Sequence, residues 1–219
     1  PLKPPPPRHK DVMPIDSKWP VVSKGCFIAP TATISGDVAI GASSAVWYGA
    51  VVRGDLSRVQ IGGNTNISHR AVIISDSEEK KVKIGDNVLV GQGATLGAAT
   101  IEDGACIGMG ATISDGVTIG AGSAVAAGSF VPPGTKVPEG QLFGGSPAVF
   151  IKALTAADAT AHKEALARLA AAATLHSSEV GKTFAQIAEE KAEYGFAKAH
   201  EPTLEDEFGL LEGETAKVW

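Results

Sequence analysis

The sequence predicts an all-β left-handed parallel β-helix, a triangular prism of stacked hexapeptide coils, followed by C-terminal α-helices. Three observations lead to this fold. Aliphatic residues recur at every sixth position through the middle of the chain. Of the 26 glycines, 22 lie between Gly25 and Gly145, where such coils need tight corners. After residue 150 the pattern changes to an alanine-rich helical periodicity.

The hexapeptide repeat comprises eighteen positions, each occupied by Ile, Val or Leu. These positions are Ile28, Ile34, Ile40, Val46, Val52, Ile61, Ile67, Ile73, Ile84, Val90, Leu96, Ile101, Ile107, Ile113, Ile119, Val125, Val131 and Val137. A six-residue period gives one short strand and one corner per repeat, and three repeats close one coil. We therefore expect each of these side chains to point inward and to stack on its counterpart one coil above. A longer step after Val52 and a charged loop over residues 75–83 interrupt the period.

Composition divides the chain into four segments. Residues 1–20 form a proline-rich extended arm with four basic and two acidic residues, a net charge of +2. The β-helix domain spans residues 21–150, and a helical region spans residues 151–199. Residues 200–219 form an acidic tail, in which six acidic residues and one lysine give a net charge of −5. This tail is either a solvated end or a docking strap for a basic partner.

Two capping boxes predict the C-terminal helices. Thr155 with Asp158 opens the first helix, and Thr183 with Gln186 opens a second that extends to about residue 197. One apolar stripe of the first helix consists of Leu166, Leu169, Ala170 and Ala173. We expect this stripe to pack against the β-helix rather than against a membrane.

The composition also excludes several classes of protein. No run of residues approaches the roughly 18 apolar residues of a membrane-spanning helix. A net charge of −5, without a basic stripe, argues against nucleic acid as a partner. Cys26 and Cys106 are too few for a disulfide framework or a thiolate zinc site, and we expect both to be small buried residues in a reducing compartment.

Several motifs of the repeat region resemble those of the γ-class carbonic anhydrases. The similar segments are Ala29-Pro30-Thr31-Ala32, Ser35-Gly36-Asp37-Val38, Ile40-Gly41, Ala50-Val51-Val52-Arg53-Gly54-Asp55, Ile61-Gly62, Thr65-Asn66-Ile67, Ile84-Gly85-Asp86-Asn87-Val88, Ile107-Gly108-Met109-Gly110-Ala111 and Gly144, Ser146, Pro147 and Ala148. They cover roughly residues 27–153. The segment that follows, as far as Lys191, is similar to the C-terminal part of γ-carbonic-anhydrase subunits of mitochondrial complex I in plants and algae.

An active enzyme of this family holds zinc through three histidines between neighbouring subunits, and the metal lowers the pKa of the water that attacks CO₂. The resemblance places the three ligand positions at Ile74, Gln92 and Gly97, and the position of an assisting glutamine at Ser68. All three histidines are therefore absent from this chain. The resemblance implies that the chain has no catalytic residue and binds no metal of its own.

Two further features concern charged and titratable residues of the β-helix. The pair Arg53 and Asp55 matches a pair that forms ion pairs between subunits in the family, and the alternative is a bridge within the chain. His69 is the only histidine of this region, and it is either a hydrogen-bonding residue at a surface or interface, or the base of a hexapeptide acyltransferase. The remaining histidines, which have no metal-ligand spacing, are His9, His162, His176 and His200.

The resemblance thus implies a non-catalytic γ-carbonic-anhydrase-like structural subunit of mitochondrial NADH:ubiquinone oxidoreductase. The resemblance implies a trimer or heterotrimer with related chains, peripheral to the inner membrane and on the matrix side of the membrane arm. Zinc would be held by partner subunits only. Two alternatives stay open: a hexapeptide-repeat acyltransferase, and CO₂ hydration only in a mixed trimer, where two competent partners keep at most one site.

Overall fold

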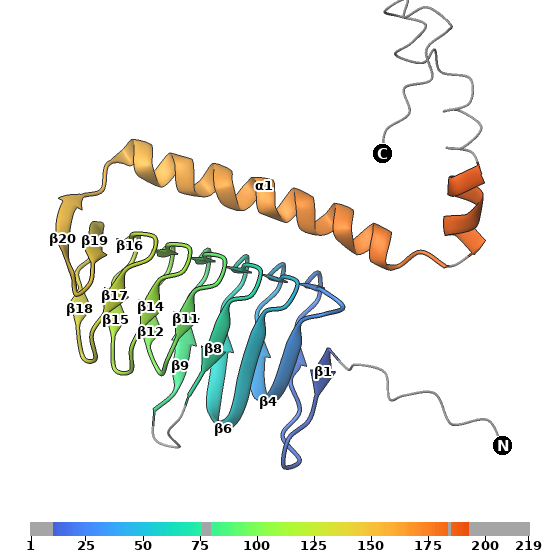
Figure 1. Cartoon of the computed structure of the whole chain (residues 1–219), viewed down its shortest axis with the longest axis horizontal. Helices are drawn as coiled ribbons and strands as arrows, with labels where there is room; N and C mark the ends of the chain where they lie inside the picture. Colours follow the sequence, from blue (N-terminus) through green and yellow to red (C-terminus); the bar gives the residue numbers. More distant parts are fainter. Residues whose placement is uncertain (1–10, 76–79, 184, 193–219) are drawn as a thin grey trace, which may run out of the picture. The chain divides into compact units, whose positions relative to one another are not determined.

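A computed structural model describes residues 11–75, 80–183 and 185–192 (Figure 1). Contacts divide the chain into two units, residues 1–177 and residues 178–219. The first unit contains all the strands and most of the helix α1 (Ala156–Val180). The strands form the predicted β-helix of hexapeptide repeats, and helices follow it, so the predicted fold is confirmed.

The β-helix has three faces, which we name A, B and C. Face A is an eight-stranded sheet made of β3 (Phe27–Ile28), β5 (Ala45–Val46), β7 (Asn66–Ile67), β10 (Leu89–Val90), β13 (Cys106–Ile107), β16 (Ala124–Val125), β19 (Gln141–Gly145) and β20 (Ala148–Ala153). Faces B and C form one twelve-stranded sheet, because two long strands, β4 (Thr33–Ile40) and β6 (Val51–Ile61), contribute to both faces.

The remaining strands complete faces B and C. The further strands of face B are β1 (Val12–Met13), β8 (Val72–Ile74), β11 (Thr95–Leu96), β14 (Thr112–Ile113) and β17 (Phe130–Val131). The further strands of face C are β2 (Val21–Val22), β9 (Val82–Ile84), β12 (Thr100–Ile101), β15 (Thr118–Ile119) and β18 (Lys136–Val137). The pairings of these strands between coils are parallel, whereas β20 runs antiparallel to β19.

Stacked aliphatic side chains form the core of the β-helix. On face B, Ile34, Val52 and Ile73 are register partners on consecutive coils, and all three are fully buried. Seventeen of the eighteen predicted inward positions are buried. The exception is Ile28, which is half-buried because its strand β3 is the edge of face A and has a neighbour on one side only.

Aspartate side chains connect consecutive coils at the corners. The carboxylate of Asp86 accepts the backbone N–H of Gly63 at 2.6 Å, and the N–H of Asp86 itself donates to Asp103 at 2.9 Å. At another corner, Asp115 accepts the N–H of Ala98 at 2.9 Å. These carboxylates satisfy backbone donors that the strand ladders leave unpaired. They explain why aspartate recurs beside the corner glycines.

The first coil begins earlier in the chain than the sequence predicts. β1 pairs with β4, with Val12 opposite Ile34, and β2 pairs with the same strand. The part of the predicted arm from residue 12 onward therefore lies in the β-helix, and β20 extends the sheet to Ala153 rather than to residue 150. The beginning of the arm and the acidic tail lie outside the described residues.

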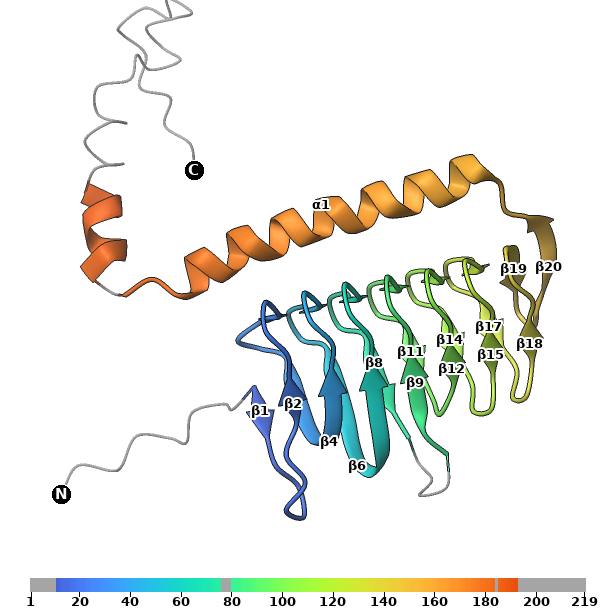
Figure 2. The ribbon, with the colours of Figure 1, turned by 180° about the vertical axis from the view of Figure 1, so that it is seen from behind.

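Helix α1 begins at the predicted capping box and runs back along face A (Figures 1 and 2). The backbone N–H of Thr155 donates to Asp158 at 2.8 Å, and the N–H of Asp158 donates to the Thr155 hydroxyl at 3.3 Å. Lys152 pairs with the same carboxylate at 3.1 Å. The hydrogen bonds from Thr155, and then the one from Lys152, lower the pKa of Asp158 to about 2.

The buried stripe of α1 differs at one position from the predicted one. Leu166 and Ala173 are buried, and Leu169 packs partly against the core, as predicted. Ala170 is exposed, and Ala172 packs against the core instead. Both sets of positions fit helical periodicity, and the contacts of His176 with Trp47 and Tyr48 turn the side of α1 that carries position 172, not position 170, toward face A. No helix of the described residues is long and apolar enough to span a membrane.

Residues 185–192 form the helical segment of the second unit. The predicted capping box precedes it: the N–H of Thr183 donates to the side chain of Gln186 at 2.8 Å, and the N–H of Gln186 donates to the Thr183 hydroxyl at 3.3 Å. The rest of the predicted second helix, from residue 193 to 197, lies outside the described residues.

Two glycines of one corner provide a test of how closely the coils are packed. A Cβ atom at Gly108 would lie 2.4 Å from the backbone nitrogen of Ala127, whereas a Cβ at Gly110 would meet no atom within 4 Å. We expect Gly108→Ala to lower the free energy of unfolding by about 1–3 kcal/mol or more. The measurement is urea denaturation followed by circular dichroism.

The matched control is Gly110→Asn. Gly110 has a φ of +64°, which asparagine tolerates better than most residues, so this change should cost about 0.5 kcal/mol. Equal losses in the two variants would show that backbone conformation, and not the close approach of coils, requires glycine at this corner.

Candidate functional site

The three positions that the resemblance assigns to zinc ligands lie on two edges of face B. Gln92 is in the turn that precedes β11, and Gly97 follows the same strand. Ile74 ends β8, the neighbouring strand, in which Ile73 is the register partner of Leu96. Ile74 and Gly97 are therefore adjacent on consecutive coils, at the opposite edge of the face from Gln92.

This arrangement decides whether one chain can bring the three positions together. Gln92 and Gly97 are separated by five residues of extended chain, up to about 16 Å. Zinc ligands lie about 2 Å from the metal, so their donor atoms must converge within a few ångströms. A site that uses all three positions therefore requires two chains, one contributing the edge of Ile74 and Gly97 and the other the edge of Gln92.

The side chains at these positions do not suit zinc. Ile74 is apolar and half-buried, and Gln92 offers only an exposed amide. Gly97 has no side chain, and a Cβ there would lie 2.3 Å from a carboxylate oxygen of Asp115. That oxygen accepts the N–H of Ala98. The space beside Gly97 is thus occupied by an aspartate that supports the backbone.

Ser68, at the position of the family's assisting glutamine, belongs to a buried hydrogen-bond network. The indole N–H of Trp47 donates to the Asn66 side chain at 2.5 Å, and the amide of Asn66 donates to the Ser68 hydroxyl at 2.9 Å. All three residues are buried. This chain of hydrogen bonds holds face A to its neighbouring corner, and it directs the Ser68 hydroxyl toward Asn66.

Arg53 and Asp55 form a salt bridge within the chain. The hydrogen bond from Arg53 is the main reason why the pKa of Asp55 lies below its ordinary value. The pair is at the surface, with side-chain exposures of 52% for Arg53 and 21% for Asp55, so it is not buried. Arg53 is also the register partner of Ile74, which places the pair beside the ligand-position edge.

His69 lies in an aromatic cluster that the sequence did not predict. Its ring stacks on Trp47, with centroids 5.1 Å apart, and on Tyr48, with centroids 5.9 Å apart. His176 of α1 completes the cluster through a 3.0 Å hydrogen bond between its Nδ1 and the Tyr48 hydroxyl. Phe27 packs on the other side of Trp47. The cluster fixes the later part of α1 on face A.

The position of His69 in the repeat relates it to Gln92. The backbone N–H of Gly93 donates to the His69 carbonyl at 2.9 Å, so the two residues occupy equivalent places on consecutive coils. The signal that sequence reasoning overlooked is the adjacent pair Trp47 and Tyr48 in a chain with only 5% aromatic residues.

Other titratable residues near these edges have structural partners. Lys80, at the end of the charged loop, lies 3.8 Å from Asp115, and the preceding residues 76–79 are outside the described part of the chain. Among the described residues, no group of three or more His, Cys, Asp or Glu side chains has an arrangement that could hold a metal ion.

Comparison with known proteins gives matches of two kinds. A family model described as bacterial transferase hexapeptide, with six repeats, matches residues 98–133. Two Arabidopsis thaliana proteins, gamma carbonic anhydrase 2, mitochondrial, and gamma carbonic anhydrase 3, mitochondrial, are 40% and 42% identical to this chain. The alignments cover 84% and 80% of this chain, and 68% and 70% of the relatives.

Two solved structures share the fold over most of their length. A putative acetyltransferase from Bacillus cereus has a TM-score of 0.74 and 34% identity, covering 76% of this chain and 96% of that protein. A hexapeptide transferase family protein from Anaplasma phagocytophilum has a TM-score of 0.70 and 32% identity, covering 74% of this chain and 96% of that protein.

The surroundings of His69 in the aromatic cluster predict the direction in which its pKa is shifted. Burial is the main cause that lowers the pKa of His69 below its ordinary value of 6.5, and the charge of His176 lowers it further. In wild-type protein the NMR titration midpoint of His69 should therefore lie below 6.5. Replacing His176 by glutamine should raise this midpoint part of the way back.

The same shift implies a pH dependence of stability. Because the unfolded chain binds the His69 proton more readily, this contribution to the free energy of unfolding is complete above pH 6.5 and declines as the pH falls toward the folded pKa.

The control for His176→Gln is Tyr48→Phe, which removes the hydrogen bond between Tyr48 and His176 but keeps the charge of His176. A His69 midpoint that does not move in His176→Gln would contradict the assigned role of His176.

Proposed function

The chain belongs to the γ-carbonic anhydrase family, and from this premise we propose that it is a non-catalytic structural subunit, which forms a trimer with itself or with related chains. The observation that carries the proposal is the set of residues at the ligand positions. Ile74, Gln92 and Gly97 provide no imidazole, and the Asp115 carboxylate occupies the space beside Gly97. No metal is assigned to this chain, and zinc would be held by competent partner subunits.

The three faces of the β-helix differ in ways that support face B as the subunit interface. Face A is covered by α1. The outward row of face C carries the exposed polar residues Gln60, Lys83 and Lys136. The outward row of face B contains Val51, Val72 and Phe130, together with threonines. An apolar row of this kind is the natural surface for a partner β-helix.

The division of the ligand positions between the two edges of face B also favours a trimer. In a closed ring, each interface joins the Gln92 edge of one chain to the Ile74 and Gly97 edge of the next. Each chain then contributes to two interfaces, and a chain without ligands removes both sites that it borders. The surface pair Arg53 and Asp55, beside Ile74, is placed to exchange its partners across this interface.

The cellular role that we propose is attachment to the membrane arm of mitochondrial NADH:ubiquinone oxidoreductase, on the matrix side of the inner membrane. Support comes from the relatives, which are mitochondrial gamma carbonic anhydrases. The assignment to this complex itself is the expectation that the resemblance of the C-terminal segment implies. The test is native mass spectrometry of the complex purified from its source: a mixed trimer with at most one zinc is expected, and absence of the chain from the complex would refute the assignment.

An acyltransferase is the second candidate, because the two solved structures named above are described as transferases. His69 is the only histidine of the β-helix region, and its ring is stacked on Trp47 and Tyr48. Calorimetry with acetyl-CoA discriminates the two candidates. Saturable binding would favour the transferase, and we expect none.

The ligand positions predict the metal content of this protein and of a repaired variant. Purified wild-type trimer should contain zinc well below one ion per chain after exposure to zinc and dialysis. A variant with Ile74→His, Gln92→His and Gly97→His, and with Asp115→Ser to clear the space beside position 97, should bind about one zinc per chain. Atomic emission spectrometry measures both.

The control for this experiment is the same set of histidines in a chain that does not assemble. Because the ligands come from two subunits, adding Val72→Glu to the repaired variant should abolish zinc binding. Stoichiometric zinc on the unmodified wild-type trimer would overturn the proposal that the chain is non-catalytic.

Two charge-changing substitutions, one on face B and one on face C, test which face forms the subunit interface. Val72→Glu places an unpaired carboxylate in the apolar row of face B and should convert the trimer to monomers in analytical ultracentrifugation. Lys83→Glu makes a larger change of charge on face C and should leave the trimer intact. The opposite result would assign the interface to face C.

A further inference from the structure

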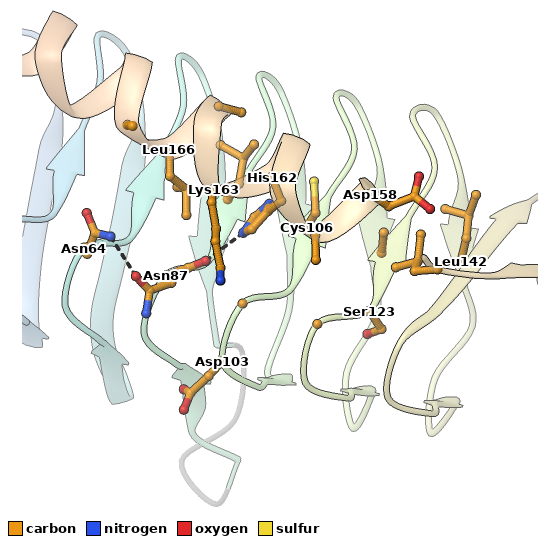
Figure 3. A pocket seen from close by; sticks show the side chains of 18 of the residues that line it. Asn64, Asn87, Asp103, Cys106, Ser123, Leu142, Asp158, His162, Lys163 and Leu166 are labelled. Atoms are coloured by element: carbon orange, nitrogen blue, oxygen red, sulfur yellow. Dashed lines mark hydrogen bonds between the residues drawn. The ribbon is translucent and has the colours of Figure 1, made fainter. Parts of the chain in front are cut away.

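A groove separates the first half of α1 from face A, and it is unrelated to the ligand positions on face B. Its volume is about 1030 Å³. Figure 3 shows side chains of the helix on one wall and the outward row of the sheet on the other. The apolar residues that line it are Leu89, Cys106, Ala124, Leu142, Leu154 and Leu166.

The groove exists because the side chains of α1 cover only one half of face A closely. Under the later part of α1, the outward residues Phe27, Ala45 and Asn66 are buried. The next outward residues along the same face, from Leu89 to Leu142, are only half-buried. The helix residues that line this part include small side chains such as Ala159 and Ala165, which leave the apolar row incompletely covered.

Of the two cysteines, only Cys106 lines the groove. Both were predicted to be buried, and both are half-buried. Cys106 points into the groove, and burial raises the pKa of its thiol, so it remains neutral and adds to the apolar surface. Cys26 lies elsewhere, with its thiol 3.1 Å from the carbonyl oxygen of Gly41.

Two lysines and two aspartates line the groove, and one of the lysines has neither an ion-pair nor a hydrogen-bond partner among the described residues. Lys152 is paired with Asp158, and the ring Nε2 of His162 is 2.9 Å from the carbonyl oxygen of Asn87. The carboxylate of Asp103, on the rim, accepts the N–H of Asp86. Lys163 makes no ion pair or hydrogen bond with any residue that the structure describes, and in Figure 3 it extends from α1 toward the corner at Asn87.

We propose that this groove binds an amphipathic anion: a single acyl chain, which lies along the apolar row from Leu89 to Leu142, with a carboxylate or phosphate head group at Lys163. The volume is at the upper end of the range for small-molecule sites, about 300–1,000 Å³. The lining contains Leu and Ala and no Phe, Tyr or Trp, and its one aromatic ring, the imidazole of His162, is hydrogen-bonded to the Asn87 carbonyl, so the groove offers a nucleotide base little surface for stacking. The unpaired ammonium group supplies the complementary charge.

Calorimetric titration of the whole chain with three probes tests the proposal. Laurate and dodecyl phosphate carry the two possible head groups, and methyl laurate has the same chain without a charge. We expect one laurate or dodecyl phosphate per chain, and weaker binding of the neutral ester. The stronger of the two anions identifies the head group, a carboxylate as in a fatty acid or a phosphate as in a phospholipid.

Variants locate the site. Ala124→Phe fills the groove and should weaken laurate binding at least tenfold, while Thr118→Phe, an equivalent change on face C of the same coil, should have no effect. Cys106→Phe is a second groove-filling variant in case the first is unstable. Lys163→Gln should weaken the anions about three- to fivefold, as expected for an exposed charge pair, and leave methyl laurate unchanged.

Alkylation of the two cysteines gives an independent readout. Bound laurate should slow the reaction of Cys106 with iodoacetamide and leave Cys26 unaffected. Unchanged laurate affinity in both groove-filling variants would overturn the proposal. Slow backbone hydrogen exchange along the groove in the ligand-free protein would also overturn it, if the cause is a neighbouring subunit that covers the groove. None of these outcomes depends on zinc or on the identity of the ligand positions, so the proposed function is tested separately.

Discussion

The structure depends on the stacking of one aliphatic side chain on the next between consecutive coils. Each inward Ile, Val or Leu packs directly on its register partner, as Ile34, Val52 and Ile73 do on face B. The same vertical repeat aligns the backbones into parallel ladders, so hydrophobic packing and hydrogen bonding impose a common period. Everything outside the prism follows from this constraint, because outward residues are then fixed in rows. Residues far apart in the sequence therefore become neighbours on one face, as Val51 and Val72 do on face B.

Asp115 illustrates how the supporting residues and the family's chemistry share the same corners. Asp86 and Asp103 bind backbone N–H groups of neighbouring coils and are part of the scaffold. Asp115 does the same for Ala98, and all three carboxylates fill the space where a side chain at a neighbouring corner glycine, Gly62, Gly85 or Gly97, would begin. The position that the resemblance assigns to a metal ligand, Gly97, thus lies at a corner with the same backbone support as its neighbours.

The sequence predicted what depends on its own period and missed what depends on distant contacts. The inward positions follow from a six-residue repeat, and Ile28 deviates only because its strand is at the edge of face A. The capping residue Thr155 was identifiable from a local motif. The bond between Tyr48 and His176 joins residues 128 positions apart, and no local pattern indicates it. The exposure of Ala170 and the groove beneath α1 depend on how the helix settles on face A, which alanine-rich periodicity does not determine.

The reversal of the last strand has a consequence for the ends of the prism. A stack of parallel coils has no intrinsic limit, because each coil presents to the next the same backbone groups that its predecessor presented to it. Such a stack could grow into a fibre by joining molecules end to end. Here β20 turns back antiparallel to β19, so an incoming coil at this end meets a strand of the wrong direction. The polarity of a single hairpin thus prevents face A from continuing into another molecule, although faces B and C end in parallel strands.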